Sequence, residues 1–274
     1  MTQTWHSEDV PEDPPLTLGG LARALLRGVP LAINTFGCLA LLLLVRLIER
    51  PLFGQRRPIT PWITQYVCRS AFVILGMGYR LEGRPMAGPG ALVSNHASWL
   101  DIFALNAPQR IYFVSKAEVA RWPGIGWLAR ATGTVFIRRD RAEAASQKAL
   151  FQERLSQGHR LLFFPEGTST DGQRVLPFRS TLFAAFFDDG LPEDMALQAV
   201  TLVYEAPDGE DSRFYGWWGD MTFDGHLLKT LTARRQGSVR VVFHEPLLVR
   251  DLSGRKEAAA VLEAQVRAPF EGAE

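Results

Sequence analysis

The sequence predicts an α/β fold in which helices flank a sheet, with apolar helices ahead of it at the N-terminus. From about residue 79 onward, short apolar runs of strand length alternate with longer stretches of helical period. Two longer apolar segments precede this region. Hydrophobic residues make up 47% of the 274 residues, enough to fill the core of one domain of this size.

The overall composition excludes several classes of protein. The formal net charge is +1, so no general positive field favours a nucleic-acid partner. The two cysteines, Cys38 and Cys68, lie in apolar segments and have neither a disulfide pattern nor metal-ligand spacing. The five histidines are equally scattered, so we expect no metal site. Because the two cysteines show no disulfide pattern, we expect the folded part to lie in a reducing, cytosolic environment.

Residues 1–22 form an acidic segment with three prolines and no Lys or Arg. This composition predicts a mobile tail. It also lacks the basic start of a secretory signal.

Residues 29–45 form an apolar run near the lower length limit for crossing a bilayer. Its centre, residues 39–45, is apolar on every side, which is not typical of a one-sided soluble helix. Arg46, Arg50 and further arginines follow the run, which predicts a cytoplasmic C-terminal flank. Crossing the membrane and lying in its surface both remain open, and a buried helix of the domain is the alternative.

Residues 61–79 are a second apolar segment that contains Trp62, Tyr66 and Phe72. Arg69 in its middle makes a membrane crossing costly. We therefore expect an amphipathic helix that rests on lipid and packs onto the folded domain. This divides the chain into a tail at 1–22, membrane-attachment helices at 23–80 and an α/β domain at 81–274.

Within the α/β domain the pattern predicts six strands and several helices. The strands are expected at residues 91–94, 111–115, 134–137, 160–164, 197–204 and 239–244, and the clearest helices at 142–157 and 255–266.

His96 and Asp101 lie where the strand at 91–94 turns into a helix. Residues five apart do not share a helix face, but a turn between them can fold the imidazole against the carboxylate. Such a pair suits a general base whose second ring nitrogen is held by an acid. The alternative is a simple capping box from Ser98 to Asp101, which needs no catalysis.

Glu166 follows the apolar strand at 160–164 in the turn Pro165-Glu-Gly167. The proline ends the strand and the glycine permits a tight turn, so the acid projects from the strand end, where α/β folds bind ligands. A plain surface turn is the alternative.

Basic residues gather at other strand ends. Arg138, Arg139 and Arg141 follow the strand at 134–137, Lys116 follows 111–115, and Arg179 comes later in the chain. Guanidinium groups match both phosphate and carboxylate, so these residues predict an anion-binding rim.

Four blocks of sequence together resemble a known family. They are Asn95-His96-x4-Asp101, the strand end from Gly133 to Arg139, Phe164-Pro-Glu-Gly-Thr168 and the strand at 197–204. Their order and spacing resemble the 1-acyl-glycerol-3-phosphate (lysophospholipid) O-acyltransferase family of the His-x4-Asp type, over about residues 80–205.

The resemblance implies a glycerolipid acyltransferase-like mixed sheet flanked by helices, with N-terminal membrane-associated helices. It implies transfer of a fatty acyl group from acyl-CoA or acyl-carrier protein to the hydroxyl of a lysolipid, with no further cofactor. His96 corresponds to the base and Asp101 to its orienting partner, while Arg139, Glu166, Gly167 and Thr168 correspond to acceptor binding, with Lys116 and Arg179 added from the basic rim.

The expected acceptor is 1-acyl-glycerol-3-phosphate, giving phosphatidate, with a lyso-ornithine or other lyso-aminolipid as the second choice. The head group stays open because two acceptor-binding segments depart from the family: the chain has Arg138 where the family commonly has Asp or Asn, and Ser169 where it commonly has Arg. The fourth block also departs, with Ala199 where the family usually has Pro. We expect the enzyme at a bacterial inner membrane, in contact with membrane lipids, with its catalytic domain on the cytoplasmic side.

Two other classes compete with this interpretation. A hydrolase is disfavoured because the chain has no Gly-x-Ser-x-Gly sequence. A non-catalytic membrane lipid-binding protein leaves His96, Asp101 and Glu166 without a role.

Overall fold

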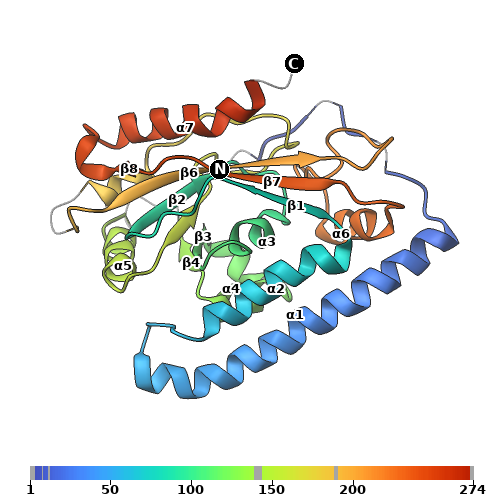
Figure 1. The fold of residues 1–274 in the computed structure, drawn as a ribbon, viewed down its shortest axis with the longest axis horizontal. Coiled ribbons are helices and arrows are strands. Elements are labelled where there is room, and N and C mark those ends of the chain that lie inside the picture. The colour runs from blue at the N-terminus through green and yellow to red at the C-terminus, as the bar shows by residue number, and fades with distance from the viewer. Residues whose placement is uncertain (1–3, 8, 12, 139–143, 188–190, 272–274) are drawn as a thin grey trace.

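The structure is a computed structural model that describes residues 4–7, 9–11, 13–138, 144–187 and 191–271. Its strands form one mixed sheet in the order β1-β7-β6-β2-β5-β3-β4, with β8 paired to β6 (Figure 1). The strands are β1 (Gly78–Glu82), β2 (Gly90–Ser94), β3 (Tyr112–Lys116), β4 (Val135–Ile137), β5 (Leu161–Phe163), β6 (Ala196–Glu205), β7 (Ser238–Phe243) and β8 (Leu247–Leu248). Neighbours are parallel except where β6 pairs with β7 and β8. The predicted mixed sheet is confirmed.

Helices cover both faces of the sheet. They are α1 (Leu18–Phe53), α2 (Thr60–Leu75), α3 (Asp101–Asn106), α4 (Ile125–Thr132), α5 (Ala144–Ser156), α6 (Phe223–Thr232) and α7 (Arg255–Glu271). One buried cluster joins α2, α3 and α6 to one face, and a second joins α5 and α7 to the other. Figure 1 shows α7 above the sheet and α2, α3 and α6 below it.

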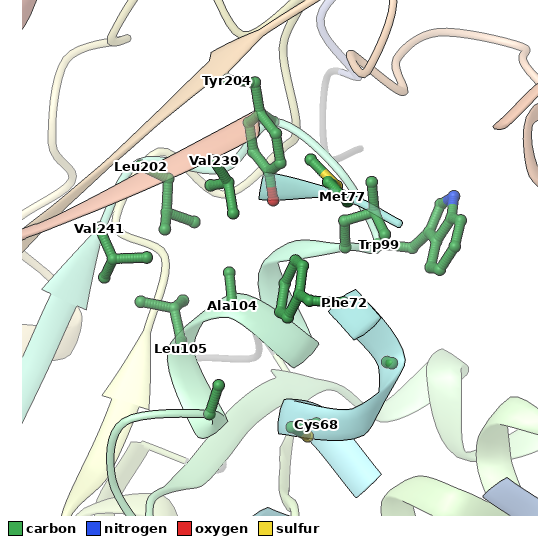
Figure 2. Close-up of a cluster of buried hydrophobic side chains, with 14 of the residues drawn as sticks. Cys68, Phe72, Met77, Trp99, Ala104, Leu105, Leu202, Tyr204, Val239 and Val241 are labelled. Atoms are coloured by element: carbon green, nitrogen blue, oxygen red, sulfur yellow. The ribbon is translucent and has the colours of Figure 1, made fainter. Parts of the chain in front are cut away.

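The cluster beneath the sheet explains why α2 belongs to the domain. Cys68 and Phe72 from α2 meet Ala104 and Leu105 from α3 and the strand residues Leu202, Tyr204, Val239 and Val241 (Figure 2). Burying a side chain the size of Phe or Leu contributes about 1.5–3 kcal/mol. On the other side of α2, the side chains of Trp62, Tyr66 and Val73 are exposed. The helix therefore has one face in the core and one apolar face outside, as its amphipathic pattern predicts.

The first helix is longer than its apolar run. Thr17 caps it, since the Thr17 hydroxyl accepts a hydrogen bond from the Gly20 amide at 3.0 Å, and α1 thus begins inside the segment expected to be a tail. Arg23 and Arg27 continue the helix and donate to carbonyls at the end of α6. These contacts hold α1 along the side of the domain (Figure 1). By length and composition α1 is able to cross a membrane.

The strand β1 was not expected, because residues 78–82 are mostly exposed and show no apolar run. It joins the sheet by parallel pairing with β7, from Gly78 opposite Ser238 to Glu82 opposite Val242. The boundary expected between residues 80 and 81 therefore falls inside a strand. The six strands from β2 to β7 lie where the sequence predicts them, within a few residues, and the two-residue strand β8 was not predicted either.

Candidate active site

The candidate residues meet at one edge of the sheet. Strands β2, β5, β3 and β4 are parallel, so their C-terminal ends lie along the same edge, where α/β sheets bind ligands. His96 follows β2, Glu166 follows β5, and Lys116 ends β3.

Asp101 is fully buried and holds His96. Its Oδ2 lies 2.6 Å from His96 Nδ1 and also accepts hydrogen bonds from the amides of Ala97 (2.9 Å) and Ser98 (3.1 Å). The Tyr204 hydroxyl donates to Oδ1 at 2.7 Å. The turn folds the imidazole back onto the acid, as the five-residue spacing predicts.

The capping-box alternative describes only half of this geometry. The carboxylate of Asp101 accepts from the Ser98 amide, but α3 begins at Asp101 rather than after Ser98. The Ser98 hydroxyl accepts only from the Leu100 amide at 3.4 Å. Asp101 therefore has two roles: its carboxylate closes the turn and also orients His96.

The hydrogen bonds fix the tautomer of His96. An ionised carboxylate only accepts hydrogen bonds, and Asp101 already accepts three others, so Nδ1 must donate its proton to it. This leaves the lone pair on Nε2. The ring stacks on Phe164 with centroids 4.0 Å apart, and its side chain is 22% exposed. Nε2 is thus the basic atom of the site.

Glu166 lies behind the turn rather than in the cavity. It is 2% exposed, its Oε1 accepts from the His96 amide at 2.7 Å, and its Oε2 accepts from the Leu176 amide at 2.9 Å. Burial raises the pKa of Glu166 to about 8, although the two amides act in the opposite direction. Both oxygens accept from the backbone and Glu166 does not line the cavity, so in this structure Glu166 holds the His96 turn, while its predicted contact with the acceptor stays a prediction.

The turn that carries His96 is held from three sides. The side chain of Asn95 makes two hydrogen bonds to the backbone of Leu202: its Nδ2 donates to the Leu202 carbonyl at 2.9 Å, and its Oδ1 accepts from the Leu202 amide at 2.8 Å. The His96 carbonyl accepts from the Thr170 amide and the Ala97 carbonyl accepts from the Trp217 amide. Such fixed backbone is what a catalytic base needs for a constant orientation.

A cavity of about 450 Å³ opens beside His96. Polar groups line one part of it, among them Lys116, Thr168 and Asp220. The rest of the wall is apolar and includes Val114, Phe163, Leu182, Trp122, Trp217 and Met221. A cavity with a charged part and a long apolar wall suits an amphipathic ligand.

The structure brings some of the predicted residues together and not others. His96, Lys116, Gly167 and Thr168 line the cavity. The side chain of Arg179 is exposed and absent from the cavity wall, although its amide donates to the Pro165 carbonyl. Its predicted role in binding is therefore not supported by its position. Arg139 lies outside the described residues.

Several residues of the site were missed from the sequence. Tyr204 reads as the end of a buried strand, and nothing local links it to Asp101. At the N-terminus, the Trp5 amide donates to the Thr168 hydroxyl at 3.2 Å, and its ring lies 5.9 Å from that of Trp218. Thr4 lines the cavity. The adjacent tryptophans Trp217 and Trp218, which both line the cavity, were an available signal in the sequence.

Comparison with known proteins identifies the family. Residues 79–192 match the acyltransferase family model. The chain is 59% identical over 263 residues to the lyso-ornithine lipid O-acyltransferase of Rhodobacter capsulatus, covering 96% of this chain and 95% of that protein. The chain belongs to the acyltransferase family. It is an O-acyltransferase, as the four sequence blocks predict.

Two further comparisons agree with the family and the fold. The acyltransferase is 37% identical over 126 residues to the 1-acyl-sn-glycerol-3-phosphate acyltransferase of Neisseria gonorrhoeae, covering 44% of this chain and 49% of that protein. Its fold matches the crystal structure of the 1-acyl-sn-glycerophosphate acyltransferase from Thermotoga maritima with a TM-score of 0.63, at 21% identity, over 92% of this chain and 95% of that one.

Proposed function

We propose that this enzyme transfers a fatty acyl group from an acyl thioester to the free hydroxyl of a lyso-ornithine lipid. The observation that carries the proposal is the 59% identity along nearly the whole of both chains to a protein of that activity. The relative named for 1-acyl-glycerol-3-phosphate matches less than half of either chain. The acceptor that the sequence placed second is therefore favoured over the one that it placed first.

The charges around the cavity support the same acceptor. Lys116 is the only Lys or Arg among the described residues that line the cavity, and Asp220 lines it as well. An ornithine head group carries a carboxylate and an ammonium, which this pair of opposite charges complements. Among the described lining residues, a phosphate monoester would meet one cation and a repelling carboxylate.

His96 and Asp101 supply the chemistry. An alcohol is a weak nucleophile, so Nε2 of His96 takes the hydroxyl proton as the oxygen attacks the thioester carbonyl. Asp101 stabilises the imidazolium through Nδ1. Collapse of the tetrahedral intermediate breaks the carbon–sulfur bond, and the thiolate takes the proton from His96. Backbone amides near the His96 turn are expected to stabilise the oxyanion.

Acyl-CoA and acyl-carrier protein both present the required thioester, and the apolar wall of the cavity suits the acyl chain of either one. Supplying each donor in turn to the purified enzyme, with the acceptor held constant, identifies the one that it uses.

The apolar surface of α1 supports attachment to the membrane. Its exposed large residues include Leu25, Leu26, Ile33, Leu44, Leu47 and Ile48. The helix is also tied along its side to the domain, for example by Asn34 Nδ2 donating to Ser70 Oγ at 2.9 Å. A helix held in this way is suited to lie in the membrane surface, with Trp62 and Tyr66 beside it and the domain on the cytoplasmic side.

Membrane fractionation tests the attachment. Wild-type enzyme should sediment with membranes in detergent-free lysates, and L26E with L44E should move it toward the soluble fraction. The matched double alanine variant keeps an apolar surface and should stay with the membranes. Wild-type enzyme in the soluble fraction would contradict the proposal.

A competition assay tests the acceptor. With lyso-ornithine lipid and 1-acyl-glycerol-3-phosphate at equal concentration, we expect at least ten-fold more acylation of the former, about 1.4 kcal/mol in transition-state binding. Preference for the phosphate would overturn the acceptor and leave the acyl transfer intact. Separately, folded His96→Ala should lose transfer to both acceptors, and turnover near the wild-type rate would remove His96 as the base.

A further inference from the structure

A second cavity, of about 420 Å³, lies at the opposite edge of the sheet. Tyr112, at the start of β3, and Arg160, just before β5, form one wall. Arg56 and Arg57, in the connection between α1 and α2, form another. The N-terminal ends of parallel strands face away from the edge that carries His96, so this cavity is separate from the active site.

The lining of this cavity is strongly basic. It contains Arg56, Arg57, Arg110 and Arg160, and no Asp or Glu occurs among its described lining residues. Burial, and then the charges of neighbouring arginines, lower the pKa of Arg57 to about 10. Burial and the charge of Arg110 lower the pKa of Arg160. Four arginines that line one cavity with no acid among its described lining residues favour a bound anion.

Glu49, a buried acid of α1, does not supply that negative charge. Glu49 is buried and already accepts hydrogen bonds from the amide of Ile59 (2.7 Å), from the Thr60 hydroxyl (2.7 Å) and from Arg46 (3.0 Å). These bonds fasten the start of α2 to α1. The Glu49 carboxylate is thus hydrogen-bonded within the α1–α2 connection, so we do not expect it to neutralise the arginines of the cavity.

Polar atoms at the cavity have unused hydrogen-bonding capacity within the described structure. Arg57 donates to the Ala131 carbonyl at 2.5 Å, yet its buried Nε has no partner there. His159 lines the cavity and is 5% exposed, and its ring packs in a tilted arrangement against Tyr112, with the ring centroids 4.2 Å apart. Apart from a weak interaction with the backbone at Gln55, neither of its ring nitrogens has a partner of normal geometry among the described residues. Unpaired buried donors are costly, so a ligand that accepts hydrogen bonds is expected here.

An apolar surface adjoins this basic cavity. The guanidinium of Arg110 lies 4.0 Å above the ring of Trp62, which is exposed. Phe53, which lines the cavity, and Ile59 are exposed beside it. Tryptophan favours the interface between lipid and water, and arginine forks match phosphate oxygens. Cationic and apolar groups side by side fit a phosphate that is attached to a lipid.

We propose that this basic cavity binds the phosphate of an anionic membrane phospholipid, at a site distinct from those of the acyl donor and acceptor. The bound lipid neutralises the arginines and holds the α1–α2 connection at the membrane surface. Free phosphate shares the same oxygen chemistry but makes no use of Phe53, Ile59 and Trp62.

Calorimetric titration of the full-length enzyme in a non-ionic detergent tests the proposal. The probes are dihexanoyl phosphatidylglycerol, dihexanoyl phosphatidylcholine and inorganic phosphate. Arg56→Gln and Arg110→Gln each remove one cation from the cavity. The matched control is Arg50→Gln, an exposed arginine in the last turn of α1 that does not line the cavity. We expect each cavity variant to weaken phosphatidylglycerol binding at least ten-fold, and the control to leave it unchanged.

The other outcomes decide against the lipid site. An equal loss in Arg50→Gln would show general attraction between charges, and unchanged binding in both cavity variants would place the lipid elsewhere. Inorganic phosphate binding as tightly as phosphatidylglycerol would identify a free-phosphate site instead. Acyl transfer by Arg56→Gln and Arg110→Gln in detergent should stay at the wild-type rate, which confirms that they are folded and that the active site is separate.

Discussion

Asp101 is the residue on which the orientation of His96 depends. Four donors converge on its two oxygens, from His96, Ala97, Ser98 and Tyr204. In the proposed mechanism the bond to His96 stabilises the imidazolium, and the other three bonds fix the carboxylate in place. Because the carboxylate is fully buried, each of these bonds is expected to stabilise it strongly.

The Tyr204 hydroxyl is the donor that can be removed alone. Tyr204→Phe keeps the ring in the core but deletes the bond to Asp101 Oδ1. A hydrogen bond to a charged group contributes about 1.5–3 kcal/mol, so we expect kcat to fall at least ten-fold. KM should change little, because the hydroxyl lies behind His96 and does not line the cavity. An unchanged kcat would show that the orientation of Asp101 does not depend on Tyr204.

Glu166 should make the stability of the enzyme depend on pH. Its pKa rises from an ordinary 4.5 to about 8 because it is buried. Between these values the folded protein keeps a proton that the unfolded chain has lost, so the free energy of unfolding should fall as pH rises through this window. Glu166→Gln removes this contribution. Thermal unfolding from pH 5 to 8.5 should show a smaller decline for the variant, and parallel curves would contradict the assignment.

The residues that the sequence identified are those whose partners are close in the chain. His96 and Asp101 lie in one turn, so their spacing alone predicts their contact. The partners of Glu166, the amides of His96 and Leu176, were not predicted because they depend on how β2 and β5 pair. Tyr204 was missed because it reaches Asp101 only when β6 lies beside β2.

Among the elements, α1 shows why an apolar run underestimates a helix. The run at residues 29–45 marks the part with no charge, but the helix extends from Leu18 to Phe53. Arg23 and Arg27 fit within it because their side chains bind the free carbonyls at the end of α6. The sequence pattern alone did not predict α6, so the hydrogen bonds of these two arginines to its last carbonyls could not be predicted either.

Arg27 joins the two helices most closely. Its guanidinium donates to the carbonyls of Leu231 (3.0 Å) and Ala233 (2.6 Å). Arg27→Gln should leave at least one of these half-buried carbonyls unpaired and lower the free energy of unfolding by about 1–3 kcal/mol. Hydrogen exchange should become faster in α6 and the start of α1. Arg50→Gln is the control, since substitution of this exposed arginine should leave the free energy of unfolding unchanged. Equal effects of the two substitutions would show that Arg27 does not hold α1 and α6 together.

At the scale of the whole molecule, the N-terminal segment connects the two ends of the enzyme. The chain passes the cavity at Thr4 and Trp5 before α1 carries it along the domain to the basic cavity. Two ion pairs accompany it, from Asp9 to Arg213 and from Asp13 to Lys229, both at 3.2 Å. A composition that predicts mobility therefore coexists with specific contacts to the loop that follows β6 and to α6, which no local pattern reveals.

Trp5 lies beside the active-site cavity, next to Thr4 and against Trp218, which both line it, and its removal should admit water. Its ring packs against Trp218 and lies 5.1 Å from the Arg174 guanidinium. Water that reaches the thioester competes with the acceptor hydroxyl for activation by His96, because the same base serves both nucleophiles. Trp5→Ala should therefore raise the ratio of free fatty acid to acylated lipid several-fold, measured with a labelled acyl thioester. Trp62→Ala, at an exposed tryptophan away from His96, is the matched control and should keep the wild-type ratio. An unchanged ratio in Trp5→Ala would mean that the N-terminal segment does not exclude water from the reaction.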